Sequence, residues 1–253
     1  MAFETNLVRV SEVTSTNEVL FRAPLSLYPF GTALMAASQT AGRGRAQRVW
    51  QSDLGGLYLS VLFRPKQVVG LALLGAYCAV KVCQSFGVST LIRWPNDIYH
   101  GERKLAGILP QVKFIGGQIE RAVLGVGLNV SQEFSDFPSC LQHDVTTLAR
   151  CLKSSDPAAE APSVESVGQA FLTVLGEELP DFERLGCSAL VERCQPLLQG
   201  YAEKSVAMVV NESGQERPLG RVAGLGPQGE LLFEDGSSLH NLGTQERLKI
   251  LCR

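Results

Sequence analysis

Residues 91–109, with the sequence LIRWPNDIYHGERKLAGIL, contain two predicted strands with no helix between them. The first strand covers residues 91–94 and ends at Pro95, which lacks the N–H group that a central strand donates. The second strand covers residues 105–113, where apolar residues are frequent. Strands that follow each other directly, without regular alternation with helices, predict an α+β fold.

The pattern of apolar residues places further elements on both sides of this segment. Strands are expected at residues 32–38, 57–63 and 122–130, and helices at 16–23, at 71–86, from 164 onward and around 181–198. Pro, Ser and Ala at residues 153–163 predict an exposed connection. We therefore expect a mixed β-sheet flanked by helices.

Beyond Gly200 the sequence changes to short β-like segments separated by turn residues. These segments cover residues 206–210, 220–225, 230–233 and 248–252. Such a series predicts a small all-β barrel of about 50 residues. We therefore divide the chain into a main catalytic domain, residues 1–199, and a C-terminal barrel, residues 200–253.

The composition argues against several classes of protein. The chain has 253 residues, and its 23 Lys and Arg nearly balance 25 Asp and Glu, so it has no overall attraction for nucleic acid. Its first residues lack the apolar stretch of an export signal, and its apolar runs are too short to cross a bilayer as a helix. We therefore expect a soluble, cytoplasmic protein that binds neither nucleic acid nor membranes.

The cysteine and histidine residues show neither a disulfide pattern nor a metal-binding pattern. Seven cysteines occur without a Cys-x-x-Cys pair, and the three histidines, His100, His143 and His240, lie far apart in the sequence. We predict reduced, mostly buried thiols and no metal site built from protein side chains.

Glycine and arginine residues alternate in a loop between two of the predicted strands. Gln39 leads into the sequence GRGR at residues 42–45, and Arg48 and Trp50 follow. Glycines let a backbone approach a ligand closely, and guanidinium groups are fixed, forked donors for anions. On the residues alone, the loop fits a phosphate site, a solvated turn or a nucleic-acid contact.

A second polar cluster surrounds the turn that follows the strand at residues 91–94. Asn96 and Asp97 supply an amide and a carboxylate, and Lys104 supplies an amine a few residues later. The same residues also fit an ordinary β-hairpin in which Asn96 and Asp97 form the turn, Trp94 packs and Lys104 is solvated. The residues of this cluster alone leave both interpretations open.

Taken together, these motifs resemble the biotin–protein ligase family. In chain order they are Ser15-Thr16-Asn17, Gln39 with GRGR at 42–45 and Trp50, WPND at 94–97 with KLAGI at 104–108, and GVGLN at 125–129. The resemblance covers residues 8–150 with specific motifs, and more loosely the β-rich tail, which looks like the family's SH3-like barrel. In two respects the chain departs from the pattern: Gln47 stands where many members have glycine, and no winged helix precedes residue 1, which implies the monofunctional type.

The resemblance implies a catalytic domain of the class II synthetase and biotin ligase type, and an ATP-dependent activity. Such an enzyme forms biotinyl-5'-AMP from biotin and ATP, with Mg²⁺ accompanying the nucleotide. It then transfers biotin to a lysine of a biotin carboxyl carrier protein or domain of a carboxylase. The sequence does not decide between a monomer and a homodimer.

The resemblance also implies roles for individual residues. The predicted catalytic residues from the resemblance are Arg43 and Lys104, which would hold the biotin carboxylate and the α-phosphate. Asp97 is added as a catalytic residue on chemical grounds, as one candidate to orient the acceptor amine. The predicted biotin-binding residues are Ser15, Thr16, Asn17, Gln39, Gly42, Arg43, Gly44, Arg45, Lys104 and Gly107. The predicted ATP- and adenylate-binding residues are Arg43, Arg45, Trp50, Asn96, Lys104 and Asn129.

Three other functions compete with this interpretation. A lipoate or octanoate ligase or transferase would share the catalytic fold and differ only in the pocket. A nucleic-acid-binding module would use the arginines of the loop, although the near-neutral total charge argues against it. A non-catalytic regulator would bind biotin and leave ATP unchanged.

Overall fold

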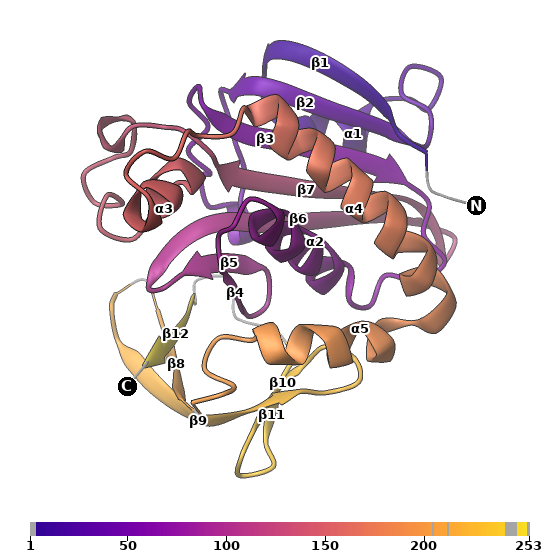
Figure 1. The fold of residues 1–253 in the computed structure, drawn as a ribbon. Coiled ribbons are helices and arrows are strands. Elements are labelled where there is room, and N and C mark those ends of the chain that lie inside the picture. The colour runs from indigo at the N-terminus through magenta and orange to yellow at the C-terminus, as the bar shows by residue number, and fades with distance from the viewer. Residues whose placement is uncertain (1–3, 204, 212, 241–246, 252–253) are drawn as a thin grey trace.

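The computed structural model describes residues 4–203, 205–211, 213–240 and 247–251 of the chain. Helices and strands follow one another in irregular order and build two β-sheets (Figure 1). This arrangement confirms the predicted α+β class, with a mixed sheet flanked by helices.

The larger sheet has seven strands in the order β1-β2-β3-β7-β6-β5-β4. They are β1 (Asn6–Val13), β2 (Thr32–Gln39), β3 (Gly56–Phe63), β4 (Leu91–Arg93), β5 (Asp97–His100), β6 (Arg103–Ile115) and β7 (Gln118–Asn129). β1 pairs with β2 in parallel, and the other neighbours pair antiparallel. The turn between β4 and β5 therefore lies beside β6, which carries Lys104.

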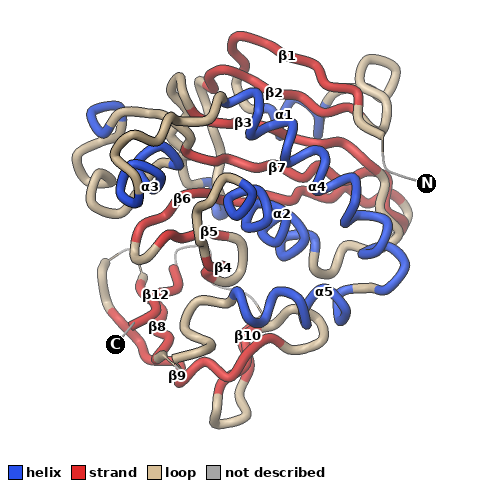
Figure 2. The backbone as a smooth tube through the Cα atoms, viewed as in Figure 1, coloured by secondary structure: helices blue, strands red, loops and turns tan. Residues whose placement is uncertain are grey.

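Helices cover both faces of this sheet (Figures 1 and 2). α2 (Leu71–Ser85) packs on β6 and β7, and α4 (Val164–Leu185) packs beside it on β3. α1 (Thr16–Arg22) lies on the opposite face, against β2, β3, β6 and β7. The sheet is thus the middle of three layers, and α1 shares its face with the polar residues described below.

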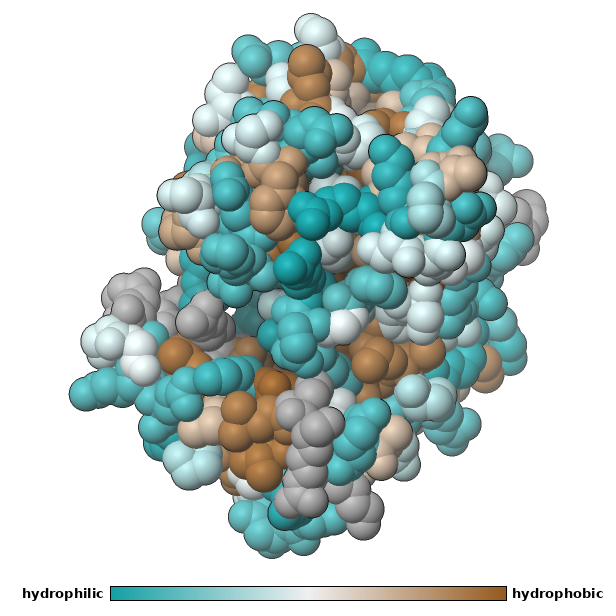
Figure 3. Space-filling model, turned by 60° about the vertical axis from the view of Figure 1, so that its left-hand side comes forward, coloured by the Kyte–Doolittle hydropathy of each residue, from teal (hydrophilic) through white to brown (hydrophobic). Residues whose placement is uncertain are grey.

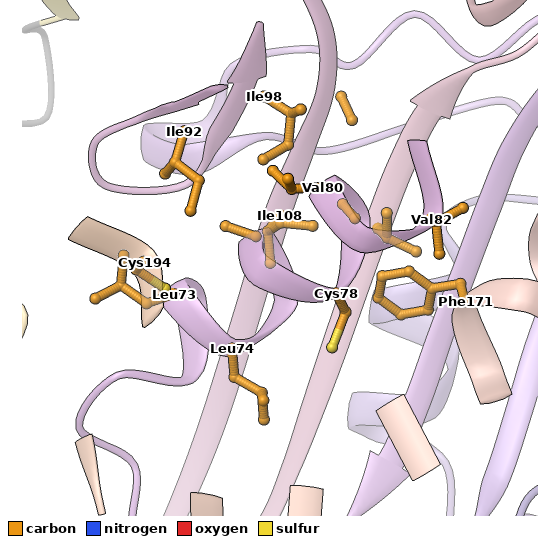
Figure 4. Close-up of a cluster of buried hydrophobic side chains, with 14 of the residues drawn as sticks. Leu73, Leu74, Cys78, Val80, Val82, Ile92, Ile98, Ile108, Phe171 and Cys194 are labelled. Atoms are coloured by element: carbon orange, nitrogen blue, oxygen red, sulfur yellow. The ribbon is translucent and has the colours of Figure 1, made fainter. Parts of the chain in front are cut away.

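The main hydrophobic core fills the space between the sheet and the helices α2 and α4. Figure 4 shows Cys78 of α2 beside Phe171 of α4, with Leu74 on the neighbouring turn of α2. Gly75 lets α2 approach β6, because a Cβ there would lie 2.6 Å from a methyl carbon of Ile108. Fully burying one such apolar side chain contributes about 1.5–3 kcal/mol to stability. A smaller cluster between α1 and the other face contains Leu20, Leu34, Leu62 and Val123.

The second sheet has five strands in the order β11-β10-β9-β8-β12. They are β8 (Val206–Val210), β9 (Glu216–Leu225), β10 (Leu231–Phe233), β11 (Ser238–Leu239) and β12 (Arg247–Leu251). Apolar residues of this sheet, among them Val222 and Phe233, belong to the same core cluster as α2. The β-rich C-terminal region is therefore present, while its SH3-like topology and the domain boundary after residue 199 remain predictions.

Several elements differ from the sequence-based expectation. The strands β1 and β5 and the helix α3 (Leu148–Ser155) were not predicted, and α3 includes the first residues of the expected connection at 153–163. The helix expected around 181–198 is wrong as a single element. Instead, α4 ends at Leu185, α5 (Cys187–Cys194) follows, and a 3-10 turn covers Gln195–Leu197. Gly186, at φ +84°, separates α4 from α5, since this left-handed region favours glycine.

The cysteines of the described residues form no disulfide bond. Five of the described cysteines are free and buried, and Cys140 is free and exposed, whereas Cys252 lies outside the described residues. No helix among the described residues is both long and apolar enough to cross a membrane. Figure 3 shows hydrophilic and hydrophobic residues interspersed over one face of the molecule, with strongly hydrophilic side chains near its centre.

Candidate active site

A cavity of about 640 Å³ lies at the start of α1, and two cross-strand pairs form its floor. Ser60 of β3 pairs with Gly125 of β7, and Gly127 of β7 pairs with Gly107 of β6. Because side chains alternate along a strand, these residues face away from α2 and α4. Three of the four have no side chain, so other groups can reach the sheet backbone closely.

Hydroxyl and amide side chains form a connected network at the α1 end of the cavity. The Oγ1 of Thr16 lies 2.8 Å from the Oγ of Ser60, which donates to Oδ1 of Asn17 at 2.8 Å. Oε1 of Gln39 accepts from the backbone N–H of Thr16 at 2.8 Å, and its Nε2 donates to the Oγ of Ser52 at 2.9 Å. Such a network holds its donors and acceptors in fixed directions.

The network limits what Asn17 can offer to a ligand. Its Nδ2 donates to the backbone oxygen of Leu109 at 2.9 Å and to Oε1 of Gln111 at 3.1 Å, which uses both amide hydrogens. Gly125 makes room for this amide, because a Cβ at that position would collide with it. Asn17 can therefore only accept a further hydrogen bond, through Oδ1. Ser15, which is buried, precedes α1 and makes no side-chain cap bond to the helix.

The glycine–arginine loop forms a narrow hairpin beside the network. The backbone N–H of Trp50 donates to the oxygen of Gly42 at 2.9 Å, and that of Gly44 donates to the oxygen of Arg48 at 2.7 Å. A 3-10 turn, Arg45–Gln47, closes the hairpin. A Cβ on Gly42 would collide with the backbone oxygen of Trp50, so the base of the loop requires glycine.

Two residues of this turn have strained backbones. Ala46 has φ +55° and Gln47 has φ +61°, in the left-handed region that glycine adopts without penalty. This conformation gives a physical reason for the glycine that many family members carry at the position of Gln47. In this chain the hairpin carries a conformational cost at that position.

Arg43 and Arg45 of the loop and Lys104 of β6 face the same cavity. Arg43 forms an ion pair with Glu18 of α1 at 3.1 Å, and Nη1 of Arg45 donates to Oδ1 of Asn96 at 3.3 Å. Burial lowers the pKa of Arg45, although a guanidinium remains protonated at neutral pH. The loop and the β4–β5 turn thus meet at a positively charged part of the cavity.

Lys104 lies between a carboxylate and an aromatic ring. Its Nζ is 2.7 Å from Oδ1 of Asp97 and 5.3 Å from the centre of the Trp50 ring. The ring covers two glycines of the floor, since Cβ atoms on Gly107 and Gly127 would lie 3.1 and 2.5 Å from it. Nε1 of Trp50 is buried without a partner among the described residues, which costs about 1–3 kcal/mol. A ligand with an acceptor at this point would remove that cost.

The outer end of the cavity is formed by the segment after β7 and by β12. The backbone N–H of Lys104 donates to the oxygen of Asp144 at 2.8 Å, and Thr146 donates back to the oxygen of Lys104 at 2.9 Å. Leu248 of β12 and Tyr99 of β5 also line this end. Burial raises the pKa of Tyr99 to about 12, so its hydroxyl stays protonated at neutral pH.

The cavity brings together most of the residues that the sequence indicated. Its wall includes Ser15, Thr16, Asn17, Gln39, Arg43, Gly44, Arg45, Trp50, Asn96, Asp97, Lys104 and Gly107. Gly42 lies at the base of the loop outside this wall. Asn129 also lies outside it: the residue is buried, and its Nδ2 donates to the backbone oxygen of Thr146 at 3.0 Å. Its side chain supports the segment that pairs with Lys104, and the expected contact with a nucleotide remains a prediction.

Sequence analysis did not identify three polar residues of the network, Ser52, Ser60 and Gln111. Ser60 is a polar residue inside an otherwise apolar strand, a signal that could have indicated a lining position. Ser52 and Gln111 act through partners far away in the sequence, and no local pattern reveals those contacts. Within the described ranges, no group of three or more His, Cys, Asp or Glu side chains could hold a metal ion.

Comparison with known proteins identifies one family whose sequence model matches part of this chain. Residues 9–129 match the sequence model of the Biotin/lipoate A/B protein ligase family. The chain is 28% identical over 243 residues to the bifunctional ligase/repressor BirA of Bacillus subtilis. These aligned residues cover 94% of this chain and 72% of that protein. It is 38% identical over 152 residues to a biotin–[acetyl-CoA-carboxylase] ligase of Mycobacterium tuberculosis, covering 55% of this chain and 53% of that protein.

The fold is also similar to a solved structure of a biotin protein ligase. The structure from Aquifex aeolicus, in complex with biotin and ATP, superposes with a TM-score of 0.79 at 25% identity and covers 97% of this chain and 99% of that one. The family resemblance predicted from the motifs is thereby confirmed. The chain carries a domain of the Biotin/lipoate A/B protein ligase family over residues 9–129, and its relatives include a bifunctional ligase/repressor and a biotin–[acetyl-CoA-carboxylase] ligase.

Proposed function

We propose that this protein is an ATP-dependent biotin–protein ligase that forms biotinyl-5'-AMP and transfers biotin to a lysine of a biotin carboxyl carrier protein. The observation that carries this proposal is the cavity, whose wall combines hydroxyl and amide groups with the cations Arg43, Arg45 and Lys104. A ligand with a polar ring and a carboxylate needs both environments in one cavity. The names of the Mycobacterium tuberculosis relative and of the Aquifex aeolicus structure favour biotin over lipoate as that ligand.

The first reaction joins two anions. An oxygen of the biotin carboxylate attacks the α-phosphorus of ATP, the bond to the bridging oxygen breaks, and pyrophosphate leaves. Fixed cations offset the repulsion between carboxylate and phosphate where negative charge develops. Arg43 and Lys104 are proposed to contact both groups, with Arg45 adding charge from the same loop. Mg²⁺ is proposed to arrive with ATP, neutralising phosphate oxygens while it retains several waters.

The ring of biotin is proposed to bind at the hydroxyl and amide network. Its ureido group has N–H donors and a carbonyl acceptor, which match Ser15, Thr16 and the remaining amide hydrogen of Gln39. Asn17 Oδ1 can accept one further bond, and Ser60 lies on the same wall. Trp50, whose ring packs on the glycine floor, is proposed to flank the middle of the ligand.

The adenylate is proposed to extend from the cations toward the outer end of the cavity. Asn96 holds Arg45 at the turn, and the closed hairpin of the loop excludes water from the mixed anhydride. Asn129, which lies outside the cavity wall, is proposed to support the segment around Thr146. In this arrangement the nucleotide contacts come from Arg43, Arg45, Trp50 and Lys104.

In the second reaction the amine of an acceptor lysine attacks the acyl carbon, AMP leaves and the amine loses a proton. A free lysine has a pKa of about 10.4, so a group that orients the amine and receives its proton assists the step. Asp97 is the proposed group, and Lys104 is its neighbour at 2.7 Å. An Asp97→Ala enzyme that forms the adenylate and transfers biotin at the normal rate would exclude this role.

Acid-dependent exchange of labelled pyrophosphate into ATP tests the proposed function. Biotin should support rapid exchange, and mass spectrometry should then detect biotin on one lysine of an added carrier domain. If octanoate or lipoate supported exchange better than biotin, the substrate assignment would be wrong. If the protein bound biotin without any exchange, it would be a regulator and not a ligase.

A further inference from the structure

The hairpin β4–β5, which carries Asn96 and Asp97, lies at the edge of the seven-stranded sheet. On its inner side, Asn96 is fixed to β6. Its Nδ2 donates to the backbone oxygen of Ile108 at 2.7 Å, and its backbone oxygen accepts from the backbone N–H of Ile108 at 2.8 Å. Among the described residues, no further strand of that sheet lies on the outer side of β4. Residues that contact this outer side of β4 therefore influence the position of the β4–β5 turn.

The segment that leads into the C-terminal sheet occupies this outer side. Leu198 forms a parallel bridge with Ile92, and the backbone N–H of Gln199 donates to the oxygen of Ile92 at 2.9 Å. The buried side chain of Gln199 accepts from Nε of Arg93 at 2.6 Å and donates to the oxygen of Gly101 at 3.2 Å. A single amide thus contacts both ends of the hairpin.

A second contact reaches the turn itself. Nε1 of Trp94 donates to the backbone oxygen of Gly229 at 2.8 Å, and the Trp94 side chain is buried. Gly229 belongs to the turn between β9 and β10 of the C-terminal sheet. Only Pro95 and Asn96 separate Trp94 from Asp97, so this bond fixes the chain immediately before the residues that face Lys104 and Arg45.

We infer that Trp94 and Gln199 are positioning residues through which the C-terminal sheet and the segment that leads into it hold the β4–β5 turn in register with Lys104. The inference rests on the proposed function, since it assigns a role in the adenylation reaction. Electrostatic assistance depends steeply on placement, and a displacement of about 1 Å can reduce a rate by up to roughly a hundredfold. Arg45 of the loop, Lys104 and the carboxylate of Asp97 meet at this turn, so its displacement affects the chemical step more than the binding of biotin at the network around Thr16.

Trp94→Phe tests the inference, because it keeps an aromatic ring and removes the N–H donor. The matched control is Tyr201→Phe, which removes another aromatic hydrogen bond of the same region, the one from Gln195 to the Tyr201 hydroxyl at 3.0 Å. We expect Trp94→Phe to lower kcat for biotin-dependent pyrophosphate exchange by about tenfold, with the KM for biotin unchanged. The control should keep its kcat, and both variants should unfold at similar temperatures.

A second pair of variants makes the test independent of whether Trp94→Phe folds. Gln199→Met removes both amide contacts of the hairpin, and Gln195→Met removes an amide of the same segment that contacts Tyr201 and Leu225. A lowered kcat in Gln199→Met, with kcat retained in Gln195→Met, supports the inference. Equal kcat values in all variants, or a change confined to KM, would overturn it. Absence of exchange in the unmodified protein would instead overturn the proposed function.

Discussion

The Nζ atom of Lys104 lies 2.7 Å from Oδ1 of Asp97, where β6 passes the turn between β4 and β5. The two side chains are 26% and 27% exposed, so solvent screens the pair only in part. Without a ligand, the carboxylate gives the ammonium a partner and fixes its direction. In the proposed reaction, the same ammonium faces the phosphate that Arg43 and Arg45 approach from the loop.

Lys104→Gln should therefore lower kcat for biotin-dependent pyrophosphate exchange by about a hundredfold to a thousandfold, because a fixed charge near the reacting phosphate is lost. The matched control is Lys113→Gln, on the same strand, which removes a lysine paired with Glu120 at 2.9 Å and outside the cavity. This control should keep its exchange rate. If Lys104→Gln retained more than half of the activity, Lys104 would not contact the reacting groups.

Gly127→Ala should weaken the binding of biotin and ATP. A Cβ at Gly127 would lie 2.5 Å from the indole of Trp50, so the ring must move away from the floor of the cavity. Overpacking of this kind costs the folded protein about 1–3 kcal/mol with or without ligand. Loss of about 1 kcal/mol of contact between the ligand and the displaced ring lowers the affinity by roughly fivefold. Titration calorimetry with each ligand measures the loss, and tryptophan fluorescence reports the displaced ring.

Gly168→Ala, in α4, is the control for the preceding prediction. A Cβ there would lie 3.0 Å from the sulfur of Met35, in the hydrophobic core and outside the cavity wall. Both affinities should stay within about twofold of the unmodified protein. Equal effects of the two substitutions would mean that Trp50 does not lie over the glycine floor.

The fold could be predicted wherever one segment carries its own periodicity. The apolar spacing in α2 and the run of β3 were sufficient to locate both elements. β1 was missed because its residues are mostly exposed or half-buried at the sheet edge, and β5 because it has only four residues. The break at Gly186 was missed because a glycine inside an amphipathic stretch gives no warning of a positive φ.

The candidate site could be predicted only as far as its motifs reach. The resemblance indicated the loop, the turn and Lys104, which supply the cations of the cavity. It did not indicate Ser52, whose contacts with Gln39 and Trp50 depend on how the loop returns to the sheet. Asn129 lies in a matching motif, yet its side chain points to Thr146, because a strand end also needs its neighbouring carbonyl satisfied.

The thiols should differ widely in reactivity. Burial raises the pKa of Cys83 and of Cys194 to about 12. A raised pKa lowers the thiolate fraction, to roughly one in ten thousand at pH 8 for such a group, and only the thiolate reacts with iodoacetamide. Cys140 is exposed and should be alkylated first among the described cysteines. Peptide mass spectrometry after a short reaction measures this order.

Alkylation in denaturant is the control for the thiol prediction, because unfolding removes the burial that raises each pKa. All cysteines should then react at similar rates. Fast labelling of Cys83 in the folded protein would show that α2 opens readily, since this thiol lies in the core cluster. The described packing of α2 against the sheet would then be wrong.

The last prediction concerns the strained turn of the loop. Gln47 has φ +61°, a conformation that costs a residue with a side chain about 1–2 kcal/mol more than glycine. Gln47→Gly should therefore shift the loop toward the closed hairpin and protect the bonds after Arg43, Arg45 and Arg48 from trypsin. Slower cleavage by about fivefold, followed by mass spectrometry of the fragments, is the expected result.

Gln51→Gly separates relief of strain from added flexibility. Gln51 is close in sequence and has no positive φ, so glycine there frees the backbone without removing any strain. Cleavage in the loop should become faster in this variant and slower in Gln47→Gly. Because water reaches the mixed anhydride through the same opening, Gln47→Gly should also release less biotinyl-5'-AMP to hydrolysis when no acceptor is present. Faster cleavage in both variants would mean that the hairpin is not the favoured state of the loop, and that its closure depends on ligand alone.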